Sequence, residues 1–425
     1  MEIKAARGTR DVLPSEAVKW RYLEDQIHRL CREYGYQEIR TPVFEHTELF
    51  VRGVGDTTDI VEKEMYTFDD RGGRSLTLRP EGTAPTVRAY LEHGLGHAAQ
   101  PTKLYYMGPI FRYERPQAGR YRQHTQFGVE VFGASDPAVD AEVICMCIDL
   151  YQRLGLRDIS VSLNSIGCPV CRPAYRERLI AHYRASMEEL CGDCLRRLER
   201  NPLRVLDCRR EGCRRLAAVA PRSLEHLCPE CTGHFTAVKN LLTALGVNYQ
   251  VDAGIVRGLD YYTKTVFEVY ASGIGAQNAL NGGGRYDGLV ETIGGTPTPG
   301  VGFGLGLERL LLVLEDRGCY LPDPPGVDAF LVTLGDRARR AGLELLYRLR
   351  KAGVSSDLDY LGRSLKAQMK YAAKLPARWA VVLGDDELER GVAALKDLTR
   401  GAQLEVSLDE LVEFLADPER KAERR

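Results

Sequence analysis

The chain has 425 residues, a formal net charge of −1 at pH 7 and 44% hydrophobic residues. This length suffices for two or three domains, each with a core of its own. The nearly neutral charge excludes a polycation that binds nucleic acid through bulk charge, so any such contact requires local basic patches. We expect a cytoplasmic protein, because the chain has no apolar run of the roughly 18 residues that cross a membrane, and its N-terminus has no apolar signal core.

Residues 15–34 carry apolar side chains at helical spacing and predict the first helix, with Ser15 as its cap and Gly35 at its end. Residues 38–45 contain Pro42 within an apolar run, which indicates an edge or interrupted strand. Subunits often meet at such strands, but an ordinary edge strand explains the pattern equally well.

Residues 77–83 predict a strand that ends and turns into a helix. Glu81 and Thr83 lie at the turn, where side chains can face a cleft, and a carboxylate there suits an ammonium ligand. Taken alone, the two residues are better explained as caps of the helix.

The segment 104–133 predicts two long strands joined by a basic, glycine-containing loop. Side chains alternate along a strand, so Gln126 and Glu130 share one face while apolar residues share the other. The loop at 115–123 contains arginines, whose guanidinium groups suit a phosphate. We interpret this hairpin as the floor of a nucleotide site with a pocket for a small polar ligand beside it. The alternative is a surface hairpin with a solvated polar face.

After a predicted helix at 137–154 and a strand at 159–164, eight of the twelve cysteines follow within 64 residues, in four pairs. Two thiolates separated by two residues can bind one metal ion from a tight turn, and two such pairs complete a tetrahedron. The four pairs predict two structural zinc sites; free or redox-active thiols are the alternative, and the spacing does not determine which pair joins which. The cysteines are Cys168, Cys171, Cys191, Cys194, Cys208, Cys213, Cys228 and Cys231.

A helix is expected past His234, ending at Gly246. Residues 256–262 then place charged and aromatic side chains beside a glycine, ahead of an alternating strand, as the wall of a site would. A strand preceded by a polar turn is the alternative. The candidate residues of this stretch are Arg257, Asp260, Tyr261 and Tyr262.

Two glycine-rich stretches follow. Residues 282–288 let the backbone approach a ligand and supply an Arg and an Asp, or else form a flexible surface loop. In residues 300–306 four glycines share one face of a strand, which is costly unless something flat lies on it, and a purine ring is the obvious candidate. Arg309 follows at the start of a helix. These glycines lie within the strand, so they are not a dinucleotide-binding fingerprint.

Beyond a proline-rich linker at 321–326, strands and helices alternate and predict a small, mostly parallel α/β sheet. Ser407 and Glu410 have the spacing of a capping box for the last helix. Four basic residues recur at helical spacing and could follow phosphates, although an exposed lysine face explains them as well. They are Lys366, Lys370, Lys374 and Arg378.

Together these motifs resemble the class II aminoacyl-tRNA synthetases, and within them the histidyl-tRNA synthetase family. Residues 111–114 resemble the second motif of that class, residues 300–310 the third, and residues 40–42 the first, at which subunits meet. Residues 257–262 and 283–287 resemble the two signatures of the histidine-specific branch. The cysteine-rich insert is a departure, since the family as a whole does not require a metal there.

The resemblance implies an α+β fold with an antiparallel catalytic sheet flanked by helices, an inserted Cys-rich domain and a C-terminal α/β anticodon-binding domain. The catalytic domain is expected at 1–167 and 235–321, the insert at 168–234 and the anticodon-binding domain at 327–425. The implied activity is that of a homodimeric histidine–tRNA ligase. It would activate L-histidine with ATP and Mg²⁺ to histidyl-adenylate, and pass histidine to the terminal adenosine of histidine tRNA.

The resemblance also assigns roles to residues. Arg257 and Arg112 would be catalytic, with Arg257 stabilising charge at the α-phosphate. ATP would be held by Arg112, Glu114, Arg120 and Arg309. Histidine would be held by Glu81, Gly82, Thr83, Gln126, Glu130, Tyr261 and Tyr262.

Two other functions compete with this one. The first is a catalytically inactive paralogue, such as the regulatory subunit of ATP phosphoribosyltransferase, which would bind histidine as a signal. The second is an RNA-binding module built on zinc knuckles. The presence of Arg112, Arg257 and Arg309 favours the enzyme, because a regulator need not keep them.

Overall fold

The structure, a computed structural model, describes residues 3–56, 58–271 and 279–417. The chain divides into two compact units, Met1–Pro322 and Asp323–Arg425, each with its own hydrophobic core. Within the described ranges no helix is long and apolar enough to span a membrane.

An eight-stranded sheet forms the centre of the first unit, in the order β1-β5-β6-β11-β10-β9-β7-β8. All neighbours are antiparallel except the two edge pairs, β1 with β5 and β8 with β7. This arrangement confirms the expected α+β class with an antiparallel catalytic sheet. The strands are β1 Gln37–Glu38, β5 Thr102–Phe111, β6 Gln123–Phe132, β7 Ile159–Ser165, β8 Tyr249–Val251, β9 Thr263–Ala271, β10 Ala279–Arg285 and β11 Gly300–Gly306.

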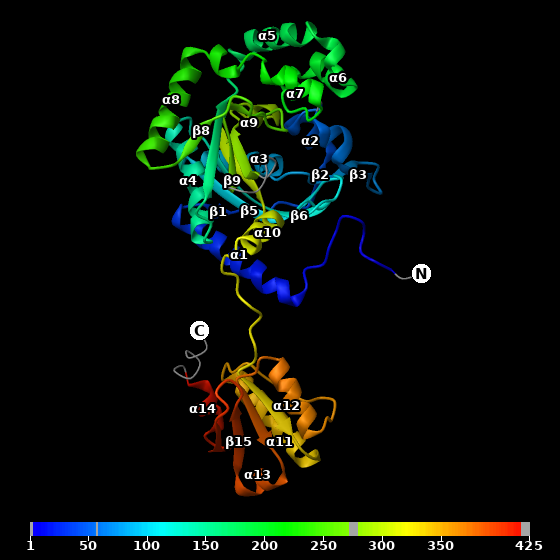
Figure 1. Ribbon diagram of the computed structural model, residues 1–425, viewed down its shortest axis with the longest axis vertical. Coiled ribbons are helices and arrows are strands. Elements are labelled where there is room, and N and C mark those ends of the chain that lie inside the picture. Colours follow the sequence, from blue (N-terminus) through cyan, green and yellow to red (C-terminus); the bar gives the residue numbers. More distant parts are fainter. Residues whose placement is uncertain (1–2, 57, 272–278, 418–425) are drawn as a thin grey trace. The chain divides into compact units, whose positions relative to one another are not determined.

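The apolar face of this sheet packs against four helices to form the main core (Figure 1). The predicted alternation of side chains is confirmed on these strands: Val129 and Phe303 point into the core, and their neighbours face the other side of the sheet. The opposite, polar face carries the candidate site. The four helices are α1 Pro14–Glu33, α4 Pro137–Arg153, α8 Pro229–Ala244 and α10 Leu307–Asp316.

Smaller elements border the polar face. A three-stranded sheet with the order β2-β4-β3 leads into α3, as the predicted strand-to-helix turn requires. The bounds are β2 Phe44–His46, α2 Thr47–Val54, η1 Ile60–Glu64, β3 Tyr66–Asp69, β4 Ser75–Leu78, α3 Thr83–Glu92, η2 Leu95–His97 and α9 Leu289–Thr292.

The cysteine-rich insert is helical and gathers at one end of the first unit (green in Figure 1). It has a small core of its own, which includes several of the cysteines. The helix that follows begins at Pro229, earlier than the expected start past His234, because proline fits the first turn of a helix. The insert contains α5 Arg172–Arg184, η3 Met187–Glu189, α6 Gly192–Arg200, η4 Pro202–Val205, α7 Glu211–Ala218 and η5 Ser223–His226.

The second unit is a five-stranded sheet with helices, in the strand order β13-β12-β14-β15-β16. The prediction of a mostly parallel sheet is wrong for half of it, because β14, β15 and β16 pair antiparallel. The sequence analysis did not predict the hairpin formed by β15 and β16. Its turn contains Gly401, whose φ of +76° suits glycine. The bounds are β12 Ala329–Thr333, α11 Asp336–Lys351, β13 Ser356–Leu358, α12 Leu365–Lys374, β14 Trp379–Leu383, α13 Asp385–Arg390, β15 Val392–Asp397, β16 Gln403–Ser407 and α14 Leu411–Ala416.

Three local predictions are also wrong. The cap of α1 is Leu13 rather than Ser15, because Pro14 occupies the first turn. Ser407 belongs to β16 and makes no capping box with Glu410. Arg378 is buried with its guanidinium 5.6 Å from the ring centre of Trp379, so it does not share an exposed face with the lysines.

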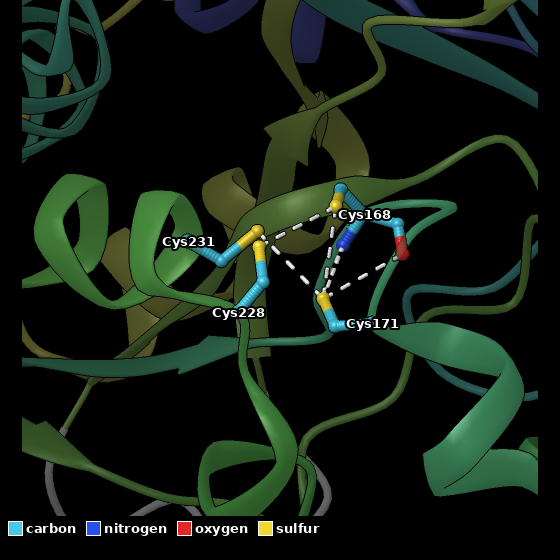
Figure 2. A group of neighbouring side chains, drawn as sticks. All are labelled: Cys168, Cys171, Cys228 and Cys231. Carbon is cyan, nitrogen blue, oxygen red and sulfur yellow. Dashed lines mark hydrogen bonds between the residues drawn. The ribbon is translucent and has the colours of Figure 1, made fainter.

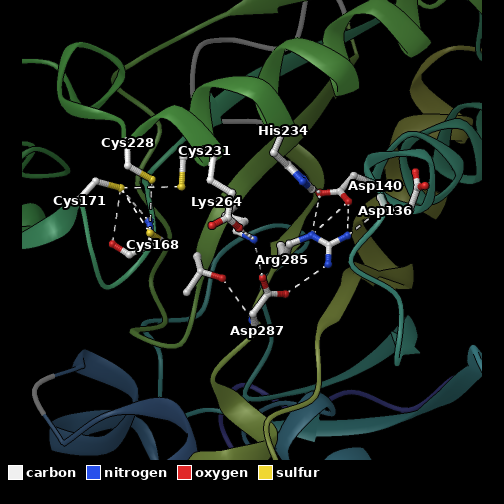
Figure 3. A network of polar contacts seen from close by, with 12 residues as sticks. Asp136, Asp140, Cys168, Cys171, Cys228, Cys231, His234, Lys264, Arg285 and Asp287 are labelled. Carbon is white, nitrogen blue, oxygen red and sulfur yellow. Dashed lines mark hydrogen bonds and ion pairs between the residues drawn. The ribbon is translucent and has the colours of Figure 1, made fainter.

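A buried ion network ties the sheet to the helices behind it (Figure 3). Arg285, at the end of β10, has no exposed surface; it pairs with Asp140 of α4, and its Nη1 lies 3.2 Å from Asp287. His234 of α8 contacts the same Asp140 carboxylate at 3.3 Å. Burial opposes ionisation of Asp140, but His234 and Arg285 hold its pKa below the usual value. Residues 282–285 are therefore part of a central strand and not a surface loop.

Asp140→Asn should destabilise the first unit strongly, because it leaves the buried Arg285 charge without a counter-ion. We expect the free energy of unfolding to fall by about 3–5 kcal/mol. Urea unfolding followed by Trp20 fluorescence in a Trp379→Phe background measures this unit alone, since the chain has 2 tryptophans.

Glu48→Gln is the matched control, because Glu48 forms an exposed ion pair with Arg52 on one face of α2. In this variant the free energy of unfolding should fall by less than about 1 kcal/mol. Similar small losses in both variants would contradict the structural role of the buried network.

Candidate active site

The polar face of the large sheet is built around glycines. One row of paired residues crosses five strands as Glu268, Gly282, Gly304, Gly128 and Tyr106, so three adjacent positions carry no side chain. The space above them is filled by polar side chains from elsewhere in the chain. The missing Cβ atoms thus let a layer of polar groups lie directly on the backbone.

The distances show how closely these groups lie. A Cβ added at Gly282 would be 2.2 Å from the Arg257 guanidinium, and one at Gly304 would be 2.0 Å from Gln126 Nε2. A Cβ at Gly302 would be 2.2 Å from Glu130 Oε2.

As predicted, the four glycines of residues 300–306 leave one face of the strand without side chains of its own. Side chains from other parts of the protein cover most of that face. Tyr286 lies over Gly300, as Glu130 and Gln126 lie over the next two glycines. Of the four glycines, Gly306 alone would have nothing within 4 Å of an added Cβ. A flat ring on this strand face thus has open space only at the Gly306 end.

Glu130 is the most deeply buried acid of this layer, with 1% of its surface exposed. Thr83 Oγ1 donates to its Oε1 at 2.7 Å, the Tyr106 hydroxyl is 3.4 Å from the same atom, and the Tyr286 hydroxyl donates to Oε2. Burial raises the pKa of Glu130 to about 8, although the hydrogen bonds from Tyr286 and Thr83 act in the opposite direction. This burial excludes the solvated surface hairpin.

Glu81, Gly82 and Thr83 meet Glu130 at the start of α3. The Glu81 carboxylate accepts hydrogen bonds from the backbone N–H groups of Thr83 at 2.8 Å and Ala84 at 2.7 Å, so it caps the helix while lying buried in the site. Burial raises the pKa of Glu81. Gly82 has to be glycine here, because a Cβ would be 2.2 Å from the ring of Tyr106.

A cluster of tyrosines closes this side of the site. The ring centres of Tyr261 and Tyr262 are 4.7 Å apart, and those of Tyr261 and Tyr286 are 5.6 Å apart. Burial raises the pKa values of Tyr106 and Tyr286 well above the usual range, so both remain hydroxyl donors. These two residues were missing from the predicted site. A signal for Tyr286 was present, since it follows directly after the glycine run of β10.

A cavity of about 370 Å³ adjoins the polar layer and is lined by four arginines, Arg112, Arg120, Arg204 and Arg309. Arg112 Nε donates to the Pro80 carbonyl at 2.6 Å, and Arg309 Nη1 donates to the Ala279 carbonyl at 2.9 Å. Burial and the neighbouring Arg120 charge lower the pKa of Arg309. This concentration of positive charge suits a polyanion.

Four carboxylates line the same cavity: Asp59, Glu64, Glu114 and Asp207. Glu114 is 3.7 Å from Arg120 and 3.8 Å from Arg112. Burial raises the pKa values of Glu64 and Asp207. Sequence reasoning missed Asp59, Glu64, Arg204 and Asp207, because they lie outside the motifs that were assigned to the ATP site.

Among the described residues that line this cavity is Gly258, but its neighbour Arg257 is not one of them. Its Nη1 pairs with Glu268 at 2.5 Å, and its guanidinium lies 5.7 Å from the ring centre of Tyr262. The structure thus brings Arg112 and Arg309 together at one cavity and places Arg257 next to it, on the side of the tyrosine cluster.

The eight insert cysteines form two groups of four, and within each group the sulfur atoms all lie within 4.8 Å of one another. Figure 2 shows the first group, with the sulfurs of Cys168 and Cys171 pointing toward those of Cys228 and Cys231. The second group is Cys191, Cys194, Cys208 and Cys213. The tertiary structure thereby decides the pairing that the spacing left open.

Comparison with known proteins identifies the family. A model described as Histidyl-tRNA synthetase matches residues 8–310, and one described as Anticodon binding domain matches residues 328–417. The chain belongs to the histidyl-tRNA synthetase family. The C-terminal unit is accordingly its anticodon-binding domain.

Relatives and solved structures agree with this assignment. The histidine–tRNA ligases of Desulforamulus reducens and Pelotomaculum thermopropionicum are both 58% identical to the chain, over 96% and 97% of it and 98% and 97% of their own lengths. The apo histidyl-tRNA synthetase structure of S. aureus is 44% identical with a TM-score of 0.84, covering 98% of this chain and all of that one. The expected function, an aminoacyl-tRNA ligase for histidine, is confirmed.

The regulatory alternative has less support. A structure from Bacillus halodurans C, titled as an ATP phosphoribosyltransferase regulatory subunit/histidyl-tRNA synthetase, is 23% identical with a TM-score of 0.64 over 90% of this chain. At that identity the likeness concerns the fold alone.

Gly302→Ala should damage the histidyl-tRNA synthetase site, because the new Cβ would lie 2.1 Å from the Val129 carbonyl oxygen and 2.2 Å from Glu130. We expect the free energy of unfolding to fall by about 1–3 kcal/mol, together with a loss of histidine binding. Denaturant unfolding and titration calorimetry with L-histidine measure the two effects.

Gly306→Ala is the matched control for stability on the same strand face, because an added Cβ there has nothing within 4 Å. Equal stability of the Gly302 and Gly306 variants would show that the close packing of Glu130 on β11 is not required.

Proposed function

We propose that the polar layer binds L-histidine and that the adjoining arginine-lined cavity binds ATP, so that the two react to form histidyl-adenylate and pyrophosphate. One observation carries this proposal: a fully buried, hydroxyl-bound carboxylate, Glu130, lies beside a cavity lined by four arginines. A carboxylate oxygen of histidine attacks the α-phosphorus, and the bond from that phosphorus to the pyrophosphate oxygen breaks. No side-chain nucleophile is required, so the residues act by positioning and by charge.

Glu130 selects the imidazole ring. It lies among the hydroxyls of Thr83, Tyr106 and Tyr286, and a ring N–H of the ligand donates to the same buried carboxylate. An analogue without that N–H loses a hydrogen bond to a buried acid, which is the kind of mismatch that lowers specificity constants by about 10⁴–10⁵. Tyr262 packs beside the ring position.

The ammonium group of histidine is held by Glu81, Thr83 and Gln126. Each Glu81 oxygen already accepts one backbone hydrogen bond and has further acceptor capacity. These two backbone hydrogen bonds fix the orientation of the Glu81 carboxylate while it contacts the ammonium group. Gly82 and Tyr261 complete the wall.

Arg112, Arg120 and Arg309 hold the phosphates of ATP, and Arg257 stabilises charge at the α-phosphate from the neighbouring side. The carboxylates Glu64, Glu114 and Asp207 have the oxygen donors that Mg²⁺ prefers, and we assign the ATP-bound ion to them. When bound, Mg²⁺ neutralises phosphate charge.

We further propose that the enzyme is a cytoplasmic homodimer that charges histidine tRNA, with the anticodon-binding domain contacting the tRNA. The segment around the short strands β1 and β2 supports a subunit contact, because Val43 and Phe44 are 40% and 48% exposed. The open outer edge of β1 is a second feature that a partner chain would cover.

Each cysteine group is proposed to hold one structural Zn²⁺. Four sulfurs placed tetrahedrally at the Zn–S distance of about 2.3 Å lie about 3.8 Å from one another. The observed Sγ–Sγ distances are 3.7 Å for Cys168–Cys171, 3.8 Å for Cys168–Cys228 and Cys171–Cys231, and 3.9 Å for Cys191–Cys208. Among the described residues each group offers four cysteine sulfurs, which is the donor set of a structural zinc site.

ATP–pyrophosphate exchange tests the proposed function. We expect exchange that depends on L-histidine in the parent enzyme and is at least about 10³-fold slower in Glu130→Gln, which removes the charge-bearing acceptor but keeps its shape. ATP affinity, measured by equilibrium dialysis, should stay within about threefold, because Glu130 does not line the ATP cavity. Exchange at the parental rate in Glu130→Gln would remove this residue from the histidine pocket.

Elemental analysis tests the metal sites and their pairing. The parent chain should contain two Zn²⁺. Cys168→Ser/Cys228→Ser changes two residues of one group and should lose one ion, whereas Cys168→Ser/Cys191→Ser changes one residue in each group and should lose both. The same zinc content in the two double variants would contradict the pairing.

A further inference from the structure

The cysteine-rich insert supplies a side chain to the ATP cavity. Arg204, in η4 of the insert, is 7% exposed and lines the cavity together with Arg112 and Arg309. Its Nη1 donates to the backbone carbonyl of Arg257 at 3.2 Å. Gly258 leaves room for this contact, since a Cβ there would be 3.3 Å from the same nitrogen. The insert thus reaches the segment that carries Arg257.

The contact between the insert and the wall of the site is largely ionic. Asp59, directly before η1, accepts from Arg197 at 2.6 Å and from Arg204 at 3.4 Å. Burial opposes ionisation of Asp59, but the charges of Arg197 and Arg204 hold its pKa below the usual value. Asn201 adds a hydrogen bond of 2.7 Å to Asp260, which lies in the same segment as Arg257.

The second cysteine group fixes the segment that bears Arg204. Val205 packs in the insert core with Cys194 and Cys213, and the backbone N–H of Cys208 donates to the Val205 carbonyl at 3.1 Å. This core is small, so four metal–thiolate bonds would supply much of its order. Cys194 of α6 and Cys213 of α7, the two helices that flank this segment in the chain, belong to the same cysteine group, and Figure 1 shows both helices at the same end of the unit.

We infer that Arg204 is a positioning residue for adenylate formation: it holds the backbone of Arg257 in place from the insert, and it does so only while the second cysteine group is metal-bound. The Cys191, Cys194, Cys208 and Cys213 centre therefore sets the rate of activation without touching a substrate. This inference rests on the proposed function, in which Arg257 stabilises charge at the α-phosphate.

Kinetics of histidine-dependent exchange in Arg204→Ala test the inference. We expect kcat to fall by about 10- to 100-fold while KM for histidine stays within about threefold, because the change displaces a transition-state contact and leaves the histidine pocket intact. Zinc content should stay at two ions per chain and the melting temperature near that of the parent. Arg204→Lys, which keeps one donor, should recover part of kcat.

Arg200→Ala is the matched control. Arg200 belongs to the same insert and pairs with Glu62 of η1 at 3.2 Å, but it is exposed and does not contact Arg257. Its kcat should stay within about twofold of the parent value. Equal kcat values for the Arg204→Ala and Arg200→Ala variants would overturn the inference.

A double-mutant cycle tests the metal dependence. Cys208→Ser/Cys213→Ser should lose one zinc ion and lower kcat as Arg204→Ala does, and combining the two changes should cause little further loss, since both act through one contact. Losses that multiply would overturn the link to the metal centre. Should the cysteine variant fail to fold, brief removal of zinc from the folded parent and from Arg204→Ala provides the same comparison.

These outcomes remain distinct from failure of the proposed function. A parent enzyme without histidine-dependent exchange contradicts the proposed function itself. A parent with normal exchange and an Arg204→Ala variant with parental kcat contradicts the role of Arg204 alone.

Discussion

The close approach of polar side chains to a glycine-lined sheet is the constraint on which this site depends. Gly282, Gly302 and Gly304 have no Cβ, so Arg257, Glu130 and Gln126 lie directly against the backbone of β10 and β11. Side chains at those positions would occupy the space of these three polar groups. Glycine is more flexible than other residues in the unfolded chain, so these strands lose more conformational entropy on folding. The apolar packing on the opposite face of the sheet offsets this cost. The same strand thus has a core face and a site face with opposite requirements.

Burying Glu130 requires support from further away. Its Oε2 accepts from Tyr286, and Tyr286 follows Arg285, which the buried Asp140 pair holds at the end of β10. Asp140 also contacts His234 of α8, and that helix begins at the first cysteine group (Figure 3). A continuous set of contacts therefore runs from a proposed metal centre to Glu130, the acid that we propose binds the imidazole. Buried pairs of this type are costly to break from one side only, which keeps the geometry of the pocket fixed.

The two cysteine groups have different structural settings. The first joins the loop after β7 to the start of α8, and so fastens the insert to the catalytic sheet. The second lies wholly within the insert, beside the segment that carries Arg204. A small helical insert with few buried apolar residues is the kind of structure that metal ligation stabilises. The family as a whole does not require a metal in this insert, and the departure of this chain coincides with an insert that contributes an arginine to the proposed ATP cavity.

Local sequence patterns alone predicted the faces of the central strands, the family and the number of cysteine groups. Strand alternation in residues 104–133 and 300–306 predicted which face is core and which is site, because the side-chain period of a strand is fixed by its backbone. The motifs around Arg112, Arg257 and Arg309 identified the family, and four cysteine pairs predicted two groups. Only the tertiary structure decided how the cysteines pair, that side chains rather than a purine cover most of the glycine face, and that Arg204 and Tyr106 join the site. Those outcomes depend on which distant segments meet, and no local pattern encodes such contacts.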